Sequence, residues 1–311
     1  MRLIHPSLTP PEKERNAAFS TWLLDIRNGE VRIRDLEDPV NSSWVRIPDT
    51  YYVPDDENGL ENLISFIYPH DTLQNPNAAE LHQKAIFCPK NDAADTINKL
   101  VVNMVDVPVT TYASYDTAAP QGNDGGESEL LYPTEYLNTV NYPGLLPHLL
   151  ELKIGVPAIL LRNINVVGGL CNGTRMIITQ LLSKVVEADI ITGTRVGEKV
   201  FFPRMNLIHK DPTLPYVLKR QQVPLKISYA MTINKSQGQS LNKIGVYLPK
   251  PIFGHGQLYV ALSRATSPNG LKILIRQHEG QEENVTKNIV YTDFLSTIAD
   301  FDATPVAHTI D

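Results

Sequence analysis

The feature that most constrains the fold is a change of rhythm in the middle of the chain. Strand-like and helix-like segments alternate up to residue 114 and again from residue 225, whereas four strand-like segments follow one another between residues 156 and 207. Alternating strands and helices are typical of a parallel α/β sheet, and short consecutive strands separated by Gly and Ser are typical of an antiparallel β unit. The sequence therefore predicts a parallel α/β domain that is interrupted by an inserted β module.

The first alternating part carries clear local signals. Thr9 and Glu12 have the spacing of a capping box, apolar residues follow at helical spacing, and Gly29 suits the helix end. Further predicted segments are an amphipathic helix over 60–67, a buried strand over 84–88, a helix from Asn91 with Ile97, Leu100, Val101 and Met104 on its apolar face, and a strand over 107–114. Residues 116–129 are rich in Asp and Gly, which favours a loop.

The inserted part and the returning α/β part follow. The four β segments are predicted at 156–161, 174–182, 185–192 and 199–207. After them we expect strands over 227–233, 243–248 and 271–275 and a helix over 256–264, followed by a polar tail from residue 277. The predicted domains are 1–145 and 225–276 for the two parts of the α/β domain, 146–224 for the inserted module and 277–311 for the tail.

Charge is distributed unevenly along the 311 residues. The net charge is −6, yet residues 151–235 hold 12 Lys and Arg against 5 Asp and Glu. A local excess of positive charge is one signature of nucleic-acid binding, although charge also fluctuates along chains without a function. The two cysteines are too few for a disulfide framework or a zinc site, which favours a reducing compartment and no metal ligands in this chain. No apolar run approaches the roughly 20 residues of a membrane span, so we expect no membrane partner.

Two segments carry candidate functional residues. Residues 232–238, Thr-Ile-Asn-Lys-Ser-Gln-Gly, place polar groups and a glycine at the end of a predicted strand, where backbone amides and a cation can face an anion. An ordinary strand-to-helix connection would have the same pattern. Arg264 follows a largely apolar helix, so its cation needs an anionic partner. That partner is either a carboxylate in a salt bridge or the phosphoryl oxygens that an arginine finger contacts.

Longer motifs that include these two segments give a more specific indication. Thr232–Leu241 (TINKSQGQSL) and Gly256–Ser267 (GQLYVALSRATS) resemble the last two signature motifs of superfamily-one DNA helicases, in the branch of the petite-integration-frequency (PIF) helicases and the Helitron transposon helicases. The segments 84–91, 132–138 and 152–175 resemble further parts of this family, in family order. The resemblance implies a RecA-like second motor domain with an inserted small SH3-like β module.

The resemblance also implies roles for single residues. Arg264 would contact the nucleotide phosphates as arginine finger, and Arg2, in a motif that the sequence carries only in part, would be a second phosphate-sensing arginine. Two residues, Gln237 and Gly238, would lie near the nucleotide at the interface of the motor domains. Three residues would face the phosphates of single-stranded DNA: Thr232, Asn234 and Lys235. Many relatives have His at the position of Asn234, which weakens the assignment there.

For the whole protein, the resemblance implies an ATP-dependent DNA helicase of five-prime to three-prime polarity. Its implied work is DNA repair, recombination and telomere or genome maintenance, in the nucleus or the mitochondrion. ATP and Mg²⁺ would be held mainly by an upstream motor domain, because no Gly-Lys dipeptide, and hence no Gly-x-x-x-x-Gly-Lys-Ser/Thr phosphate loop, occurs in this sequence. We therefore expect this chain alone not to turn over ATP. Two alternatives remain, a passive single-stranded-DNA-binding or interaction module and an inert helicase or transposon remnant.

Overall fold

The chain folds into two units, each assembled from segments that lie far apart in the sequence. The first unit comprises Met1–Pro69, Gln83–Ile97 and Ala230–Asp311, and the second comprises His70–His82 and Asn98–Tyr229. The computed structural model describes residues 9–30, 33–35, 37–38, 40–120, 132–142, 144–277 and 282–291.

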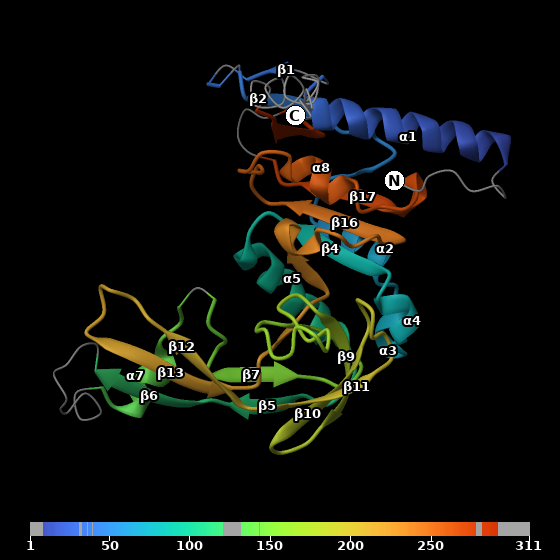
Figure 1. Ribbon diagram of the computed structural model, residues 1–311. Coiled ribbons are helices and arrows are strands. Elements are labelled where there is room, and N and C mark those ends of the chain that lie inside the picture. The colour runs from blue at the N-terminus through green and yellow to red at the C-terminus, as the bar shows by residue number, and fades with distance from the viewer. Residues whose placement is uncertain are drawn as a thin grey trace, which may run out of the picture. The chain divides into compact units, whose positions relative to one another are not determined.

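Five parallel strands form the central sheet of the first unit (Figure 1). They are β3 (Tyr52–Val53), β4 (Lys84–Cys88), β15 (Ala230–Thr232), β16 (Lys243–Leu248) and β17 (Leu271–Ile275). The strand order is β15-β4-β16-β17-β3, and each of these pairs is parallel. Strands β4 and β16 are buried along nearly their whole length, which is typical of parallel sheets covered on both faces. The predicted parallel α/β sheet is therefore confirmed.

Helices pack on this sheet for reasons that are visible in the sequence. Helix α2 (Gly59–Ile67) lies against β16 at Gly245, where an added Cβ would lie only 3.1 Å from Leu63 and 3.2 Å from Ile67. In α1 (Pro10–Asn28), Glu12 accepts from the backbone N–H of Thr9 at 2.8 Å and from its hydroxyl at 2.7 Å. The helix ends at Gly29, whose φ of 71° is left-handed and favours glycine. Both predicted helices are confirmed.

Other elements of the first unit complete its core. The helix α8 (Gln257–Leu262) buries Leu258, Ala261 and Leu262 in the same apolar cluster as residues of α1 and of the parallel sheet. A three-stranded antiparallel sheet has the order β1-β2-β18 and consists of β1 (Ile33–Arg34), β2 (Ser42–Arg46) and β18 (Val285–Ile289). Strand β18 lies in the segment that the sequence left as a polar tail, because its two apolar residues, Val285 and Ile289, stand four positions apart and do not alternate with polar ones.

The second unit is mostly antiparallel β structure. Its larger sheet has the order β11-β10-β9-β8-β14 and consists of β8 (Pro157–Leu160), β9 (Arg175–Leu181), β10 (Val185–Ile190), β11 (Lys199–Pro203) and β14 (Leu225–Ile227). A second sheet has the order β12-β13-β6 and consists of β6 (Tyr115–Pro120), β12 (Met205–His209) and β13 (Tyr216–Gln222), and β5 (Thr110–Ala113) pairs with β7 (Leu149–Leu152). Three predicted β segments are confirmed as β8, β9 and β10, whereas the fourth, 199–207, contains two strands of different sheets, β11 and the start of β12. Strand β13 is additional, and the SH3-like form stays a prediction. The second unit also contains the short helices α3 (His70–Gln74), α4 (Ala78–Leu81) and α7 (Thr134–Thr139), while α5 (Asn91–Met104) contributes residues to both units.

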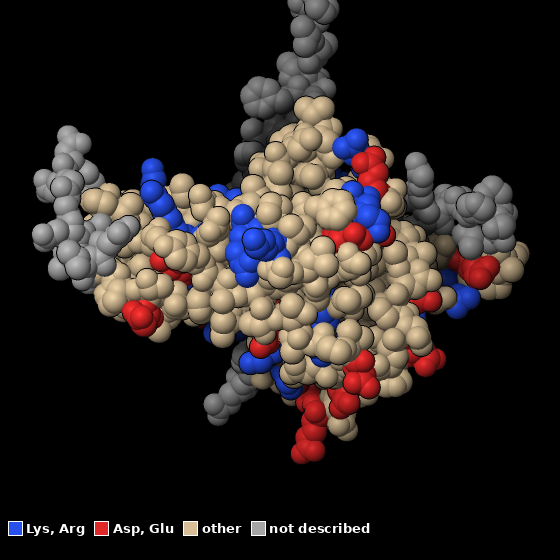
Figure 2. Space-filling view, turned by 90° about the horizontal axis from the view of Figure 1, so that it is seen from below, with Lys and Arg blue, Asp and Glu red and all other residues tan. Residues whose placement is uncertain are grey.

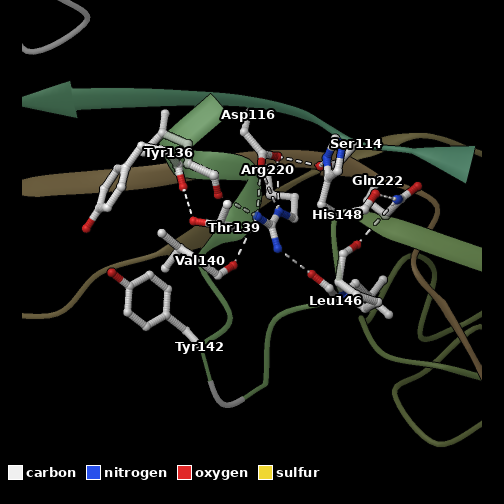
Figure 3. A network of polar contacts seen from close by, with 12 residues as sticks. Ser114, Asp116, Tyr136, Thr139, Val140, Tyr142, Leu146, His148, Arg220 and Gln222 are labelled. Atoms are coloured by element: carbon white, nitrogen blue, oxygen red, sulfur yellow. Dashed lines mark hydrogen bonds and ion pairs between the residues drawn. The ribbon is translucent and has the colours of Figure 1, made fainter. Parts of the chain in front are cut away.

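A buried ion pair holds the second unit together around β13 (Figure 3). The side chains of Arg220 and Asp116 are both fully buried, with Arg220 Nη2 at 2.6 Å from Asp116 Oδ2 and Arg220 Nε at 3.0 Å from both carboxylate oxygens. The same guanidinium donates to the carbonyls of Leu146 at 2.7 Å, Leu137 at 2.9 Å and Val140 at 3.2 Å. One cation therefore joins β6, β13 and the end of α7.

Several sequence-based expectations need correction. We expected Asp116 in a loop, but it lies in strand β6 and is buried against Arg220; residues 121–131 lie outside the described part. The strand over 107–114 is β5, which pairs antiparallel with β7 and not with the parallel sheet, because β4 already has β15 and β16 on its two sides. The single strand expected over 227–233 is two strands, β14 and β15, in different sheets.

The apolar face of α5 also differs from the expected one. Ile97 and Val101 are fully buried as predicted, whereas Leu100 is 38% and Met104 37% exposed. Val102 and Val105 are buried instead. The predicted and the observed buried faces of α5 differ because its sequence allows two overlapping apolar stripes, and packing buries one of them.

Candidate functional site

The turn after β15 holds the candidate residues of the first segment. Strand β15 ends at Thr232, a short 3-10 helix covers Ile233–Ser236, and Gly238 has a left-handed φ of 79°. The Ser236 hydroxyl donates to the carbonyl of Ile233 at 2.6 Å and is buried, so it fixes the turn and does not face solvent. No atom lies within 4 Å of a Cβ placed on Gly238, so this glycine is required for its backbone angle and not for space.

Arg264 lies directly beside this turn. Its Nη1 donates to the carbonyl of Gln239 at 3.2 Å, its Nε to the carbonyl of Val260 at 3.1 Å, and its Nη2 to the hydroxyl of Ser263 at 3.0 Å. The backbone continues the contact, since Leu241 N donates to the Arg264 carbonyl at 2.9 Å. The structure thus brings together the two segments that the sequence singled out separately.

The partners of Arg264 are all neutral. Among the described residues, no carboxylate forms an ion pair with its guanidinium, so the salt-bridge interpretation finds no support within the part of the chain that the structure describes. The side chain is half-buried and keeps its positive charge uncompensated. Such a cation is available to an anionic ligand, which fits the arginine-finger interpretation.

The other predicted residues differ in accessibility. Asn234, Gln237 and Gly238 are exposed, whereas Thr232 and Lys235 are half-buried. All five lie in the single turn at the carboxyl end of β15, the edge of an open α/β sheet where ligands gather. Arg2 lies outside the described residues.

Sequence reasoning missed Gln239. Its carbonyl accepts from Arg264, and its amide Nε2 donates to the carbonyl of Lys235 at 3.3 Å. Its Oε1 is buried and has no hydrogen-bond partner among the described residues. Gln239 therefore links the turn to Arg264 and leaves one acceptor free. Only backbone contacts and a buried amide carry this role, so no pattern of residue types could have shown it.

At least half of the 12 Lys and Arg side chains of the basic segment 151–235 bind partners inside the second unit. Arg175 and Arg220 are fully buried, and Lys153 donates to the carbonyls of Val102 and Val105 near the end of α5. Three further cations have internal partners: Arg195, Lys199 and Arg204. Figure 2 shows Lys and Arg side chains as separate patches on the described part of the face that it presents. The nucleic-acid footprint expected from net charge is therefore smaller than the sequence suggested.

Two further features bear on the kind of site. None of the described helices has the length and apolarity that crossing a membrane requires. The described residues also contain no group of three or more His, Cys, Asp and Glu side chains arranged to hold a metal ion. Burial raises the pKa of the Cys88 thiol, and Asp92 and Asp95 add to this, so Cys88 at the end of β4 stays a neutral thiol.

Comparisons with known proteins agree with the motifs. A family model described as the 2B domain of the DNA helicase Pif1 matches residues 135–181, and a helicase model named for the herpes helicase matches residues 223–294. The chain is 34% identical over 143 residues to the ATP-dependent DNA helicase PIF1 of Homo sapiens. In sequence, the chain is similar to helicases of the Pif1 family.

The shares of each chain that align show how much of these relatives the similarity covers. The match to human PIF1 takes in 45% of this chain and 21% of that protein, and the match to Pif1 of Campylobacter jejuni is 37% identical over 131 residues, with shares of 40% and 29%. The chain thus spans less than a third of the length of these relatives. The crystal structure of Pif1 helicase from Candida albicans aligns with a TM-score of 0.54 at 20% identity, over 93% of this chain and 59% of that one. This likeness and the parallel sheet show a RecA-like motor fold in this chain.

Proposed function

We propose that this chain supplies the second motor domain of an ATP-dependent DNA helicase. The observation that carries the proposal is the placement of Arg264, whose guanidinium has only neutral partners and lies against the turn of residues 232–241. Its curated relatives are named ATP-dependent DNA helicases. A family relation and a free cation beside the predicted nucleotide-facing turn support the same function.

The residues present fit a nucleotide phosphate held against this edge. ATP supplies the phosphoryl group whose charge an arginine can stabilise. The planar fork of Arg264 is oriented by the carbonyls of Gln239 and Val260, so its position is set before a ligand arrives. Gln237 and Gly238 lie in the same turn, and Gln239 offers the free Oε1 acceptor for a donor group.

We propose further that Thr232, Asn234 and Lys235 contact the phosphates of single-stranded DNA. They share one turn at the carboxyl end of β15, and contacts of this kind position a strand without reading its sequence. Motif resemblance alone supports a five-prime to three-prime polarity, roles in DNA repair, recombination and telomere maintenance, a relation to Helitron helicases, and a nuclear or mitochondrial location.

The decisive experiment restores a complete motor. A Pif1 first motor domain is fused upstream of residue 1, and DNA-stimulated ATPase activity is measured for the wild type, Arg264→Ala and Arg15→Ala. Arg15 is exposed on α1 and serves as the matched charge control. We expect Arg264→Ala to lower kcat by about 10³-fold or more, as for other arginine fingers, with Arg15→Ala unchanged. ATPase activity near the wild-type rate in a folded Arg264→Ala variant would overturn the assignment.

The passive DNA-binding alternative is tested on the chain alone. Its affinity for an oligothymidylate is measured against salt, because neutralised phosphates make the affinity fall linearly on a double-logarithmic plot. This alternative drew on the basic segment, which the internal use of Arg175, Arg220 and Lys153 has weakened. No binding at low salt would eliminate it.

A further inference from the structure

A polar cavity in the second unit belongs to none of the sites described above. Its volume is about 520 Å³, within the range of about 300–1,000 Å³ typical of small-molecule sites. The side chains that matter line it from three stretches of the chain: Leu161, Arg162, Asn163, Asn172, Ile208 and His209. Cationic, amide and apolar groups therefore meet around one space.

The two loop walls of the cavity are held in place by hydrogen bonds. The backbone N–H of Asn172 donates to Asn163 Oδ1 at 2.8 Å, which joins the two amide residues directly. The neighbouring backbone is fixed as well, since Gly173 N donates to the Leu160 carbonyl at 2.9 Å. The Nδ2 group of Asn163 and the whole side-chain amide of Asn172 have no hydrogen-bond partner among the described residues. The amide of Asn163 is held in place through its Oδ1, and both amides are available to a ligand.

His209 forms a rigid wall on the other side. Its ring stacks on Tyr142 with centroids 4.2 Å apart and planes 8° apart, and the Tyr142 hydroxyl lies 3.1 Å from the hydroxyl of the buried Tyr216. The Nε2 atom of His209 is buried and has no partner within the described part of the chain. A buried polar atom without a partner is costly unless something binds it.

One free cation of the basic segment lines this cavity and a second lies beside it. In residues 151–235, four Lys and Arg side chains have no hydrogen-bond or ion-pair partner among the described residues: Arg162, Lys184, Lys210 and Lys219. Arg162 lines the cavity, and Lys219 is the cross-strand neighbour of the lining residue Ile208. Lys184 lies away from it in the β9–β10 turn.

We propose that this cavity binds one phosphorylated nucleoside, either free or as a unit of a single strand. Arg162 would contact the phosphate, for which a guanidinium fork is suited, with Lys219 beside Ile208 adding positive charge. Asn163, Asn172 and His209 Nε2 would bond the polar edge of the base or the sugar. The lining is mostly polar, so these groups, and not the apolar contacts of Leu161 and Ile208, would carry the recognition.

The test maps where a nucleotide binds on the full chain. An oligothymidylate that contains 4-thiothymidine is photo-crosslinked, and the crosslinked peptides are identified by mass spectrometry, with and without thymidine 5′-monophosphate as competitor. We expect crosslinks in peptides that contain residues 161–172 or 205–209. If the monophosphate reduces these crosslinks, the site accepts free nucleotides. If it leaves them unchanged, the site binds a nucleotide only as part of a strand. Both results support the proposal.

Matched variants inside and outside the cavity make the test specific. Arg162→Ala should weaken binding at these peptides about tenfold or more, because a charge-assisted hydrogen bond is lost, whereas Lys184→Ala removes the same charge elsewhere and should have no effect. His209→Phe keeps a ring against Tyr142 but removes Nε2, and it should also weaken binding. The side chains of Arg162 and Lys184 are both exposed, so either can be removed without disturbing the core. Crosslinks absent from both peptides, or equal losses in Arg162→Ala and Lys184→Ala, would overturn the proposal.

The cavity and the motor function can fail separately. Lys235→Ala alters the proposed DNA contact of the first unit, and it should leave the crosslinks at residues 161–172 and 205–209 unchanged. Loss of ATPase activity in Arg264→Ala likewise bears only on the first unit.

Discussion

The buried pair Arg220–Asp116 allows the sharpest prediction about stability. Asp116→Asn keeps the size of the side chain and removes its charge. The amide nitrogen would then point donors at a guanidinium that is itself only a donor. Arg220 keeps the carbonyls of Leu137, Val140 and Leu146, but its charge is left unpaired and without water.

The expected cost follows from complete burial. Both side chains are 0% exposed, so solvent cannot compensate the lost partner. Breaking a buried pair on one side typically costs about 3–5 kcal/mol, a large share of the roughly 5–15 kcal/mol that stabilises a domain. With a urea m-value of about 2 kcal/mol/M, the unfolding midpoint of the second unit should fall by about 2 M.

The tryptophans make the assay specific. The chain has two, Trp22 and Trp44, and both lie in the first unit. Urea unfolding is followed by tryptophan fluorescence for the first unit and by hydrogen exchange of β6, β13 and α7 for the second. Asp116→Asn should accelerate exchange in those elements and shift their midpoint, while the fluorescence transition moves less.

The double variant separates a lost pair from lost packing. Asp116→Leu with Arg220→Met removes both charges and retains much of the volume, so it should be less destabilising than Asp116→Asn alone. A loss below about 1 kcal/mol in Asp116→Asn would refute the reasoning. A double variant less stable than the single one would show that the carbonyl contacts of Arg220, and not the charge pair, dominate.

Two further predictions concern the first unit. Hydrogen bonds from Lys287 and then Ser42 lower the pKa of Asp35 to about 2, so the stabilisation that its carboxylate gives is present above pH 4 and is lost as pH falls from about 4 to 2. Asp35→Asn should therefore lower the free energy of unfolding at pH 7 and remove this part of its pH dependence. Acid unfolding curves that are the same for the variant and the wild type would contradict the assignment. Gly238→Ala should cost about 1 kcal/mol because its φ is left-handed. In the fused motor it should lower DNA-stimulated ATPase activity more than Gly193→Ala, a control at a left-handed position of the second unit; equal effects would show that the turn after β15 has no special role.

Local sequence signals predicted the elements that depend on their own residues. The capping box and Gly29 defined α1, and the apolar runs defined β4 and β16. The partner of β5 could not be predicted in this way, because a four-residue strand can pair with any free edge. Strand pairing was settled by β15, which lies beyond the insertion and occupies the side of β4 that β5 would have needed.

The candidate site was predictable in part for the same reason. The motifs placed Arg264 and the turn of residues 232–238 in one site, and the structure brings them into contact. The contact itself runs through the carbonyl of Gln239, which every residue type possesses. Backbone groups carry no sequence signal, so motifs can name the charged residue of a site but not the groups that orient it.

The basic segment shows that net charge can overstate how many cations a segment exposes. Counting Lys and Arg treats each cation as exposed, but a guanidinium can instead collect carbonyls at the ends of helices, as Arg220 does at α7 and Arg175 does at Leu81 and His82 after α4. Such cations raise the charge of a segment and cannot reach a phosphate. When they are set aside, four cations of the basic segment have no partner among the described residues: Arg162, Lys184, Lys210 and Lys219. Of these, Arg162 lines the cavity and Lys219 lies opposite its lining residue Ile208, which is why the cavity, and not the whole basic segment, is the place to look for a nucleotide.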